Sequence, residues 1–146
     1  MSYPEWWSDT ITIYNRYEDP LTDIITWYRT VIDGAFWKYI GDKINIGNIT
    51  LETNNTLCRI RESQTFVPYY QWVSIPKDEK NNYFTLSVGD IIIKGDIDET
   101  IDEYSQGHRS TDFIDKYKPQ GCIVIQEVAI NVGPGREPAH YRVKGV

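Results

Sequence analysis

Apolar and polar residues alternate along most of this chain, and the alternation predicts strands. Residues 10–17 read TITIYNRY, and residues 24–32 carry a β-branched or aromatic residue at every second position. Successive side chains of a strand point to opposite faces, so a period of two indicates a strand with one buried face. Asp19 and Pro20 stand between the two segments and favour a turn. These two strands are therefore expected to form a hairpin.

Further strands are predicted on both sides of a glycine-containing segment. Residues 35–39 form a short strand, and residues 49–60 have strand patterns that Asn54 and Asn55 divide with a turn signal. The stretch between these strands, residues 40–48, contains two glycines and is predicted to be a tip or a ribbon.

The second half of the chain contains the strongest strand pattern. Residues 91–97 include three consecutive isoleucines after a turn, which suggests burial on both faces, and Gly95 inside the segment suggests a bulge. Three more strands are predicted at residues 83–86, 121–132 and 140–143.

One short helix is predicted at residues 110–118. Ser110 is a suitable N-cap, because its hydroxyl can accept a hydrogen bond from a free backbone N–H of the first turn. An apolar stripe follows at helical spacing, and Pro119 ends the helix because proline cannot continue one.

Composition favours a mainly β fold. The 146 residues include 29 Ile and Val against 7 Ala and Leu, together with 12 Thr and 20 aromatic residues. β-Branched and aromatic residues pack well on sheets, whereas Ala and Leu are the strongest helix formers. We predict a single β domain over residues 1–146, a small β-barrel or sandwich of about eight strands with one short helix and a long inserted loop. No apolar run approaches the roughly 20 residues of a membrane helix, so a soluble protein is expected.

Two segments outside the predicted strands concentrate aromatic residues. Residues 1–9 form an N-terminal arm with Trp6 and Trp7, and residues 61–82 form a long aromatic-rich excursion. Long loops are usually functional, and aromatic residues are enriched at protein interfaces and sugar-binding platforms. The N-terminal arm is expected to dock onto another subunit. In the excursion, the residues predicted to contact a partner, a sugar or the protein's own core are Tyr69, Tyr70 and Trp72.

Acidic residues are concentrated in one segment. Residues 90–115 hold eight acids and two bases, which equals the whole net charge of −6. This balance disfavours groove binding to nucleic acid, which needs a basic stripe. A solvated edge, a face turned toward a pore and a calcium site are the alternatives, although the glycine that an EF-hand loop needs is missing. The densest part carries five acids and no base: Asp96, Asp98, Glu99, Asp102 and Glu103.

The sequence contains no recognisable catalytic or metal-binding motif. It lacks G-x-S-x-G, a phosphate-binding G-K-S/T loop, G-x-G-x-x-G and H-E-x-x-H. Cys58 and Cys122 are far apart and are expected to be buried thiols, and His108 and His140 are the only histidines. We therefore predict a protein that is not an enzyme and that holds no cofactor and no metal.

Several blocks of the chain resemble small proteins of the head–tail joint of tailed phages. In chain order the blocks are TIYNRYED at 12–19, TWYRTV at 26–31, FW at 36–37, FTL at 84–86, GDIIIKG at 89–95, IQEV at 125–128 and HYRV at 140–143. Together they resemble phage head-closure or head-completion proteins, also called stoppers or neck connectors. Tyr141 stands where that family has a tryptophan, and residues 63–82 have no counterpart in its smaller members.

The resemblance implies a structural, non-enzymatic role in the neck of a virion. Such proteins are small β-barrels that form a homo-oligomeric ring, here of twelve or six copies, below the portal and adaptor. The ring closes the filled head, meets the tail-terminator protein and lets packaged DNA pass without sequence-specific binding, with no membrane contact. The protein would be made in the host cytoplasm and located in the virion. Another virion protein (tail tube, tail terminator or baseplate component) and a carbohydrate-binding module are the alternatives.

In such a ring the acidic segment would form a band of negative charge. Facing the lumen, the band would repel DNA phosphates, whereas attractive contacts would bind them through counterion release. The other possibility is that the acids meet basic residues of a neighbouring copy. The basic candidates are Arg136, Arg142 and Lys144.

Overall fold

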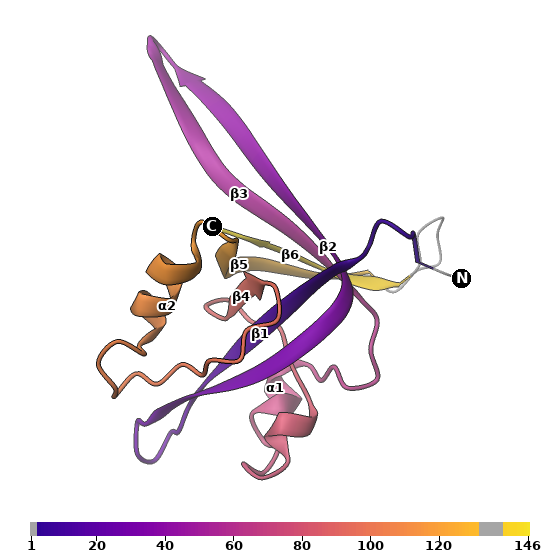
Figure 1. The fold of residues 1–146 in the computed structure, drawn as a ribbon, viewed down its shortest axis with the longest axis vertical. Coiled ribbons are helices and arrows are strands. Elements are labelled where there is room, and N and C mark those ends of the chain that lie inside the picture. Colours follow the sequence, from indigo (N-terminus) through magenta and orange to yellow (C-terminus); the bar gives the residue numbers. More distant parts are fainter. Residues whose placement is uncertain (1–2, 132–138) are drawn as a thin grey trace.

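The computed structural model describes residues 3–131 and 139–146. These residues form a closed antiparallel barrel with the strand order β1–β2–β3–β6–β5–β4 (Figure 1). The strands are β1 (Asp9–Glu18), β2 (Ile25–Ile46), β3 (Ile49–Arg61), β4 (Ile91–Lys94), β5 (Cys122–Asn131) and β6 (His140–Gly145). The helices are α1 (Tyr69–Trp72), the 3₁₀ turn η1 (Lys80–Asn82) and α2 (Ser110–Tyr117). The mainly β prediction is confirmed, with six strands in the described residues rather than about eight, and with two short α-helices rather than one.

One long strand accounts for part of the difference in strand number. β2 joins the two strands that were predicted at residues 24–32 and 35–39 and continues into the predicted ribbon. Asn54 and Asn55, which were predicted to form a turn, lie inside β3 and pair with β2. The chain reverses instead at Gly47, whose φ of 62° suits a residue without a Cβ atom.

Two predicted strands are shortened or absent. Residues 83–86 are extended, but their ladder consists of a single parallel bridge between Phe84 and Phe66. β4 ends at Lys94, before the predicted end at residue 97, because Gly95 adopts a φ of 113° that no regular strand has. The bulge expected at Gly95 is therefore a strand end.

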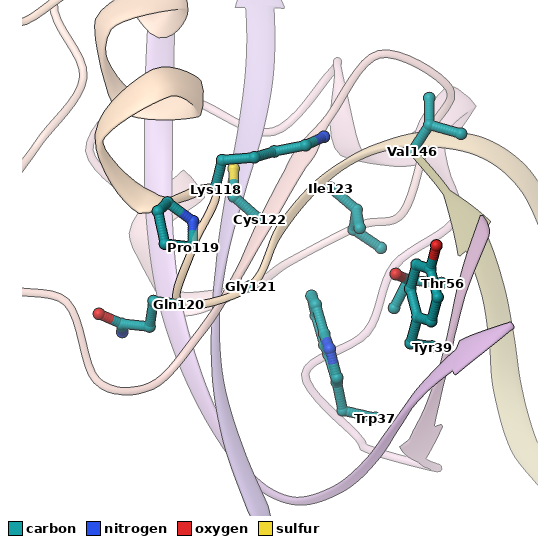
Figure 2. A pocket seen from close by; sticks show the side chains of 10 residues that line it. All are labelled: Trp37, Tyr39, Thr56, Lys118, Pro119, Gln120, Gly121, Cys122, Ile123 and Val146. Carbon is teal, nitrogen blue, oxygen red and sulfur yellow. The ribbon is translucent and has the colours of Figure 1, made fainter. Parts of the chain in front are cut away.

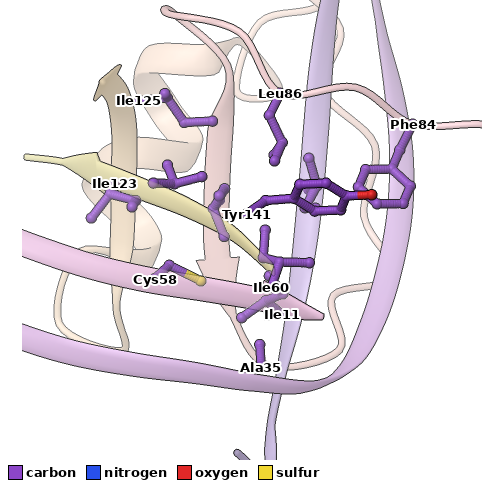
Figure 3. Packing of buried hydrophobic residues seen from close by; sticks show 12 residues of the cluster. Ile11, Ala35, Cys58, Ile60, Phe84, Leu86, Ile123, Ile125 and Tyr141 are labelled. Carbon is purple, nitrogen blue, oxygen red and sulfur yellow. The ribbon is translucent and has the colours of Figure 1, made fainter. Parts of the chain in front are cut away.

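Alternating side chains of the strands fill the barrel (Figure 3). Ile92 of β4 packs inside the barrel, whereas Ile91 and Ile93 belong to a second cluster that includes Phe113 of α2. All three isoleucines are buried, so the prediction that this strand is covered on both faces is confirmed. The buried residues of the barrel cluster are Ile11, Ile13, Ala35, Cys58, Ile60, Phe84, Leu86, Ile92, Ile123, Ile125, Tyr141 and Val143.

The predicted helix is present as α2 and begins at Ser110, but its N-cap residue differs from the expected one. Arg109 occupies the N-cap position that was assigned to Ser110, and its backbone N–H donates to Asp112 (3.1 Å). The N–H of Ser110 donates to the carboxylate of Glu103 (2.7 Å). The acidic segment therefore supplies the acceptor that was expected from the Ser110 hydroxyl. None of the described helices is long and apolar enough to cross a membrane.

The excursion at residues 61–82 is folded, and a buried lysine stands at its centre. The ammonium group of Lys80 donates to the carbonyl groups of Val73 and Ile75 and lies 4.4 Å from the centre of the Tyr17 ring. Burial lowers the pKa of Lys80. Trp72 of α1 is fully buried beside it. The segment predicted as a long loop therefore packs against β1 as part of the protein's own core.

Candidate assembly surface

A two-stranded ribbon extends beyond the barrel (Figure 1). β1 pairs with β2 only as far as Ala35, and β6 pairs with β3 only from Thr56 onward. Beyond those points β2 and β3 pair with each other, from Ile40–Asn55 to Ile46–Ile49. We name residues 40–55 the β-arm. Within the described residues, each of its two strands has one hydrogen-bonded neighbour and one edge without a partner strand.

The tip of the β-arm is apolar and exposed. Ile46 and Ile49 form the last cross-strand pair, and their exposed fractions are 61% and 63%. In sequence, apolar Ile44 and Ile46 alternate with polar Lys43 and Asn45. This alternation is typical of a strand with one buried face. The structure extends this ribbon into solvent, so nothing in the described part of the single chain covers its tip.

A hollow of about 310 Å³ lies at the base of the β-arm (Figure 2). Trp37 and Tyr39 of β2 line one side, and the segment that follows α2 lines the other, with the Lys118 side chain extending across it. Gly121 has a φ of 126°, and a Cβ atom there would approach the Trp37 ring to 3.2 Å. Glycine at this position therefore allows the indole to lie against the loop.

A thiol that lines this hollow has low reactivity. Cys122 lines it, and burial raises the pKa of its thiol to about 11, so the reactive thiolate is scarce at neutral pH. Burial also raises the pKa of Cys58. The prediction that both cysteines are buried thiols is confirmed. His140 is buried against Trp7, whereas His108 is exposed.

The predicted acidic segment is attached to its own chain. The Arg29 guanidinium lies 3.4 Å from Asp96 and 3.7 Å from Asp98. Glu99 accepts hydrogen bonds from Lys116 (2.5 Å) and from the Tyr117 hydroxyl, and these bonds lower the pKa of Glu99. These partners are basic and polar groups on β2 and α2.

The last two acids of the segment act locally. Asp102 accepts a hydrogen bond from the backbone N–H of Tyr104 (3.0 Å), and Glu103 binds the first N–H of α2. Asp98 is open to solvent, with a side chain that is 99% exposed. The structure therefore brings the five acids together along one segment, but gives at least Glu99 and Glu103 a role in holding α2.

The tryptophan pair divides between surface and core. Trp6 is 67% exposed, whereas Trp7 is 4% exposed and packs against Tyr3, Phe36 and His140. The prediction that both side chains contact another subunit is therefore wrong for Trp7, which is buried within its own chain. Neighbouring residues of an extended chain point in opposite directions, so one of them remains exposed. A partner contact at Trp6 stays a prediction.

The aromatic residues of the excursion divide in the same way. Trp72 is fully buried among the rings of Tyr17, Tyr28 and Tyr69, so it is not available to a partner or a sugar. Tyr70 is 73% exposed and Tyr69 is partly exposed, so only these two remain candidates for a contact. A sugar platform built on all three residues is not present.

The predicted basic contacts are not the residues that bind the acids within the described part of the chain. Arg142 and Lys144 lie on β6, where Lys144 stands opposite Glu127 of β5 in the strand register. Both side chains are partly buried. Arg136 lies outside the described residues. The acids in turn are close to Arg29 and Lys116, two bases that the sequence analysis did not select.

A family model matches residues 7–146, nearly the whole chain. The chain belongs to DUF6751. This is a family of unknown function. No curated protein and no solved structure matches the chain. The described residues of this DUF6751 member contain no cluster of three or more His, Cys, Asp or Glu side chains that could hold a metal ion.

A buried polar network joins the barrel of this DUF6751 protein to the segment before β4. Asp90 accepts hydrogen bonds from the side chain of Asn15 (2.9 Å) and from the backbone N–H groups of Arg16 (2.9 Å) and Ser87 (3.1 Å). Asn15 also donates to the Thr85 carbonyl (2.6 Å). Burial raises the pKa of Asp90 to about 7, and the three donors oppose that rise. This network was not predicted from the sequence, although the polar Asn15 within a strand of mostly apolar residues was a signal.

Proposed function

We propose that this protein is a structural subunit of an oligomeric ring in a phage head–tail connector. There it would close the filled head and offer a platform for the tail. The observation that carries the proposal is the β-arm with its two open edges. A closed barrel satisfies its own strand edges, whereas an open edge is a template for pairing with another chain. A chain that extends such a ribbon from a closed barrel is suited to assembly.

Two further features support this proposal. The closed barrel is the fold that the resemblance to head-closure proteins implies. The side chains of Asp96 and Asp98 are 63% and 99% exposed, so they could face a channel and repel DNA phosphates. The acids that hold α2 would not be needed for that purpose.

The first experiment shortens the β-arm. Ile40 and Asn55 are cross-strand partners, so replacing residues 41–54 with Asn-Gly closes the ribbon with a two-residue turn. The full chain is expected to form rings in negative-stain images and native mass spectra. The shortened chain is expected to stay monomeric while keeping the far-ultraviolet spectrum of the barrel. A full chain that remains monomeric at high concentration would contradict the proposal.

The second experiment tests whether the protein joins heads to tails in the virion. A phage whose gene for this chain is deleted should produce filled heads and separate normal tails, because the joint between them is missing. Purified full chain should restore infectious particles from these heads and tails, and the shortened chain should not. Tails that are missing or abnormal in length would instead assign the protein to the tail tube or the tail terminator.

A further inference from the structure

The open edges of the β-arm carry an inference about how copies of this chain meet, which rests on the ring assembly proposed above. We infer that the β-arms of neighbouring copies pair edge to edge, β2 of one copy with β3 of the next. The result would be a second barrel, made only of arms. Each copy would then contribute two strands to it.

In the described part of the chain, the backbone of the β-arm offers two unpaired strand edges of equal length. The unpartnered segments of β2 and β3 have matched lengths, because Ile40 to Ile46 pairs residue for residue with Ile49 to Asn55. An isolated two-stranded ribbon is marginally stable in water, so the β-arm needs further strands.

Within the described residues, β1 beyond Tyr14 and β2 before Phe36 also pair with a strand on one side only. There the chain's own Asp90 and Tyr104 accept hydrogen bonds from the backbone N–H groups of Arg16 and Ile25. The β-arm, in contrast, extends from the closed barrel with an open edge on each strand. A second copy supplies both kinds of edge.

The chain directions of β2 and β3 also favour this pairing. β2 and β3 are antiparallel within one β-arm. If all arms of a ring point the same way, β2 of one copy also runs antiparallel to β3 of its neighbour. Every contact is then of the antiparallel type, which is the more stable pairing. Such head-to-tail contacts use a different edge on each side, and contacts of this kind form a ring when the rotation between neighbouring copies closes.

Pairing between copies would also cover the exposed apolar tip of the β-arm. Ile46 and Ile49 are each more than half exposed in the single chain. In a barrel of arms they would form a ring of cross-strand apolar neighbours. Neighbouring apolar side chains on adjacent strands stabilise a sheet, and their burial removes apolar area from water. The same tip on an unpaired ribbon would favour aggregation.

The geometry links this pairing to copy number. Strands lie about 4.8 Å apart and tilt by roughly 40° in a barrel. Twelve arms would leave an opening of roughly 40 Å between side chains, and six arms an opening of roughly 15 Å. A DNA duplex needs an opening with a diameter of roughly 20 Å. Edge-paired arms would therefore pass DNA in a ring of twelve and block it in a ring of six.

Disulfide trapping between different chains tests the pairing. One set of chains carries Ile40→Cys or Ile46→Cys on β2, and the other carries Asn55→Cys or Ile49→Cys on β3. Because each chain has one new cysteine, a bond within one β-arm cannot form. Cys58 and Cys122 are buried and contribute little background. Mixed β2 and β3 chains should give disulfide-linked dimers on mild oxidation, in at least several-fold excess over either set alone.

Leu21→Cys serves as the control for random collisions, because Leu21 is 92% exposed on the turn between β1 and β2. It should cross-link no more than background. Dimers from β2 chains alone would show that arms pair two by two and would overturn the inference. Rings that give no cross-link between arms would overturn it as well, while leaving the proposed function standing.

Amide hydrogen exchange gives a second measurement that does not depend on the pairing register. Amides of residues 40–55 should exchange at least tenfold more slowly in the ring than in a dilute monomer. Unchanged exchange in intact rings would overturn the inference. A chain that forms no ring under any condition would instead contradict the proposed function.

Discussion

Single polar residues in the interior decide how the irregular segments attach to this barrel. Asn15 and Asp90 are both buried. Asn15 of β1 donates to Thr85 and Asp90 in the segment before β4, and Asp90 accepts in turn from the backbone N–H of Arg16 in β1. Buried polar groups are costly when they are not hydrogen-bonded, so these side chains specify one position for the segment before β4. Lys80 does the same for the excursion.

Asp90 makes the stability of the protein depend on pH in an unusual direction. Its pKa is about 7 in the folded chain because of burial, against about 3.8 when the carboxyl is free. Between these values the folded state binds more protons than the unfolded state, so this contribution to stability decreases as pH rises from about 4 to about 7. Urea unfolding of the wild type and Asp90→Asn, compared at several pH values in this window, measures it.

The asparagine variant cannot titrate, so the difference between the two proteins isolates Asp90. The wild type is expected to lose stability relative to Asp90→Asn as pH rises. The change amounts to about 1.4 kcal/mol for each unit of pKa shift. A difference that is constant with pH, or that grows in favour of the wild type, would contradict the expectation and would mean that the three N–H donors balance or outweigh the effect of burial on the pKa.

At the scale of elements, local signals were sufficient for some segments and misleading for others. α2 was predicted nearly to the residue, because an apolar stripe and Pro119 act within one helix. Asn54 and Asn55 were a turn signal, yet both lie inside β3 because the ladder with β2 continues through them. α1 was missed because its four residues are held by burial of Trp72 rather than by helix propensity.

The excursion is expected to depend on Lys80. Lys80→Met keeps most of the side-chain length but removes the donors to the carbonyl groups of Val73 and Ile75. Leaving these partly buried carbonyl groups unpaired should lower the free energy of unfolding by about 1–3 kcal/mol. The near-ultraviolet signal of Trp72 should weaken, and limited proteolysis should become faster in residues 61–82.

Lys77→Met is the matched control for this change. Lys77 is 70% exposed and lies 4.0 Å from Asp19. Exposed pairs of this kind contribute about 0–1 kcal/mol, so this variant should unfold nearly as the wild type does. Equal effects of the two substitutions would show that the buried ammonium group is not what holds the excursion.

At the scale of the whole molecule, the N-terminal segment covers the barrel rather than only reaching away from it. Trp7 packs on Phe36 of β2 and His140 of β6, and the Arg61 side chain donates to the Trp7 carbonyl (2.9 Å). Residues from opposite ends of the sequence thus meet at one end of the barrel. The segment therefore belongs to the folded core, while the β-arm and Trp6 remain on the surface.

Neighbouring tryptophans provide a direct comparison. Trp7→Ala should lower the free energy of unfolding by about 3–5 kcal/mol, because it removes a buried aromatic side chain. Trp6→Ala should change it by less than about 0.5 kcal/mol, since the side chain is 67% exposed. Thermal or urea unfolding of the two variants measures both values. If Trp7→Ala unfolds like the wild type and only assembly is weakened, the packing described here is wrong.

The sequence by itself determined the β class, the covered strand with three isoleucines, the buried cysteines and helix α2. These features depend on local sequence patterns that extend over a few residues. Examples are a period of two, a high content of β-branched residues and a proline after a helix. The closed strand order, the length of the β-arm, the burial of Trp7 and Trp72, and the partners of the five acids were decided by tertiary structure. Each of them depends on contacts between residues that are far apart in sequence. An alternating pattern of apolar and polar residues predicts that a side chain is buried, but it does not predict which residues it packs against.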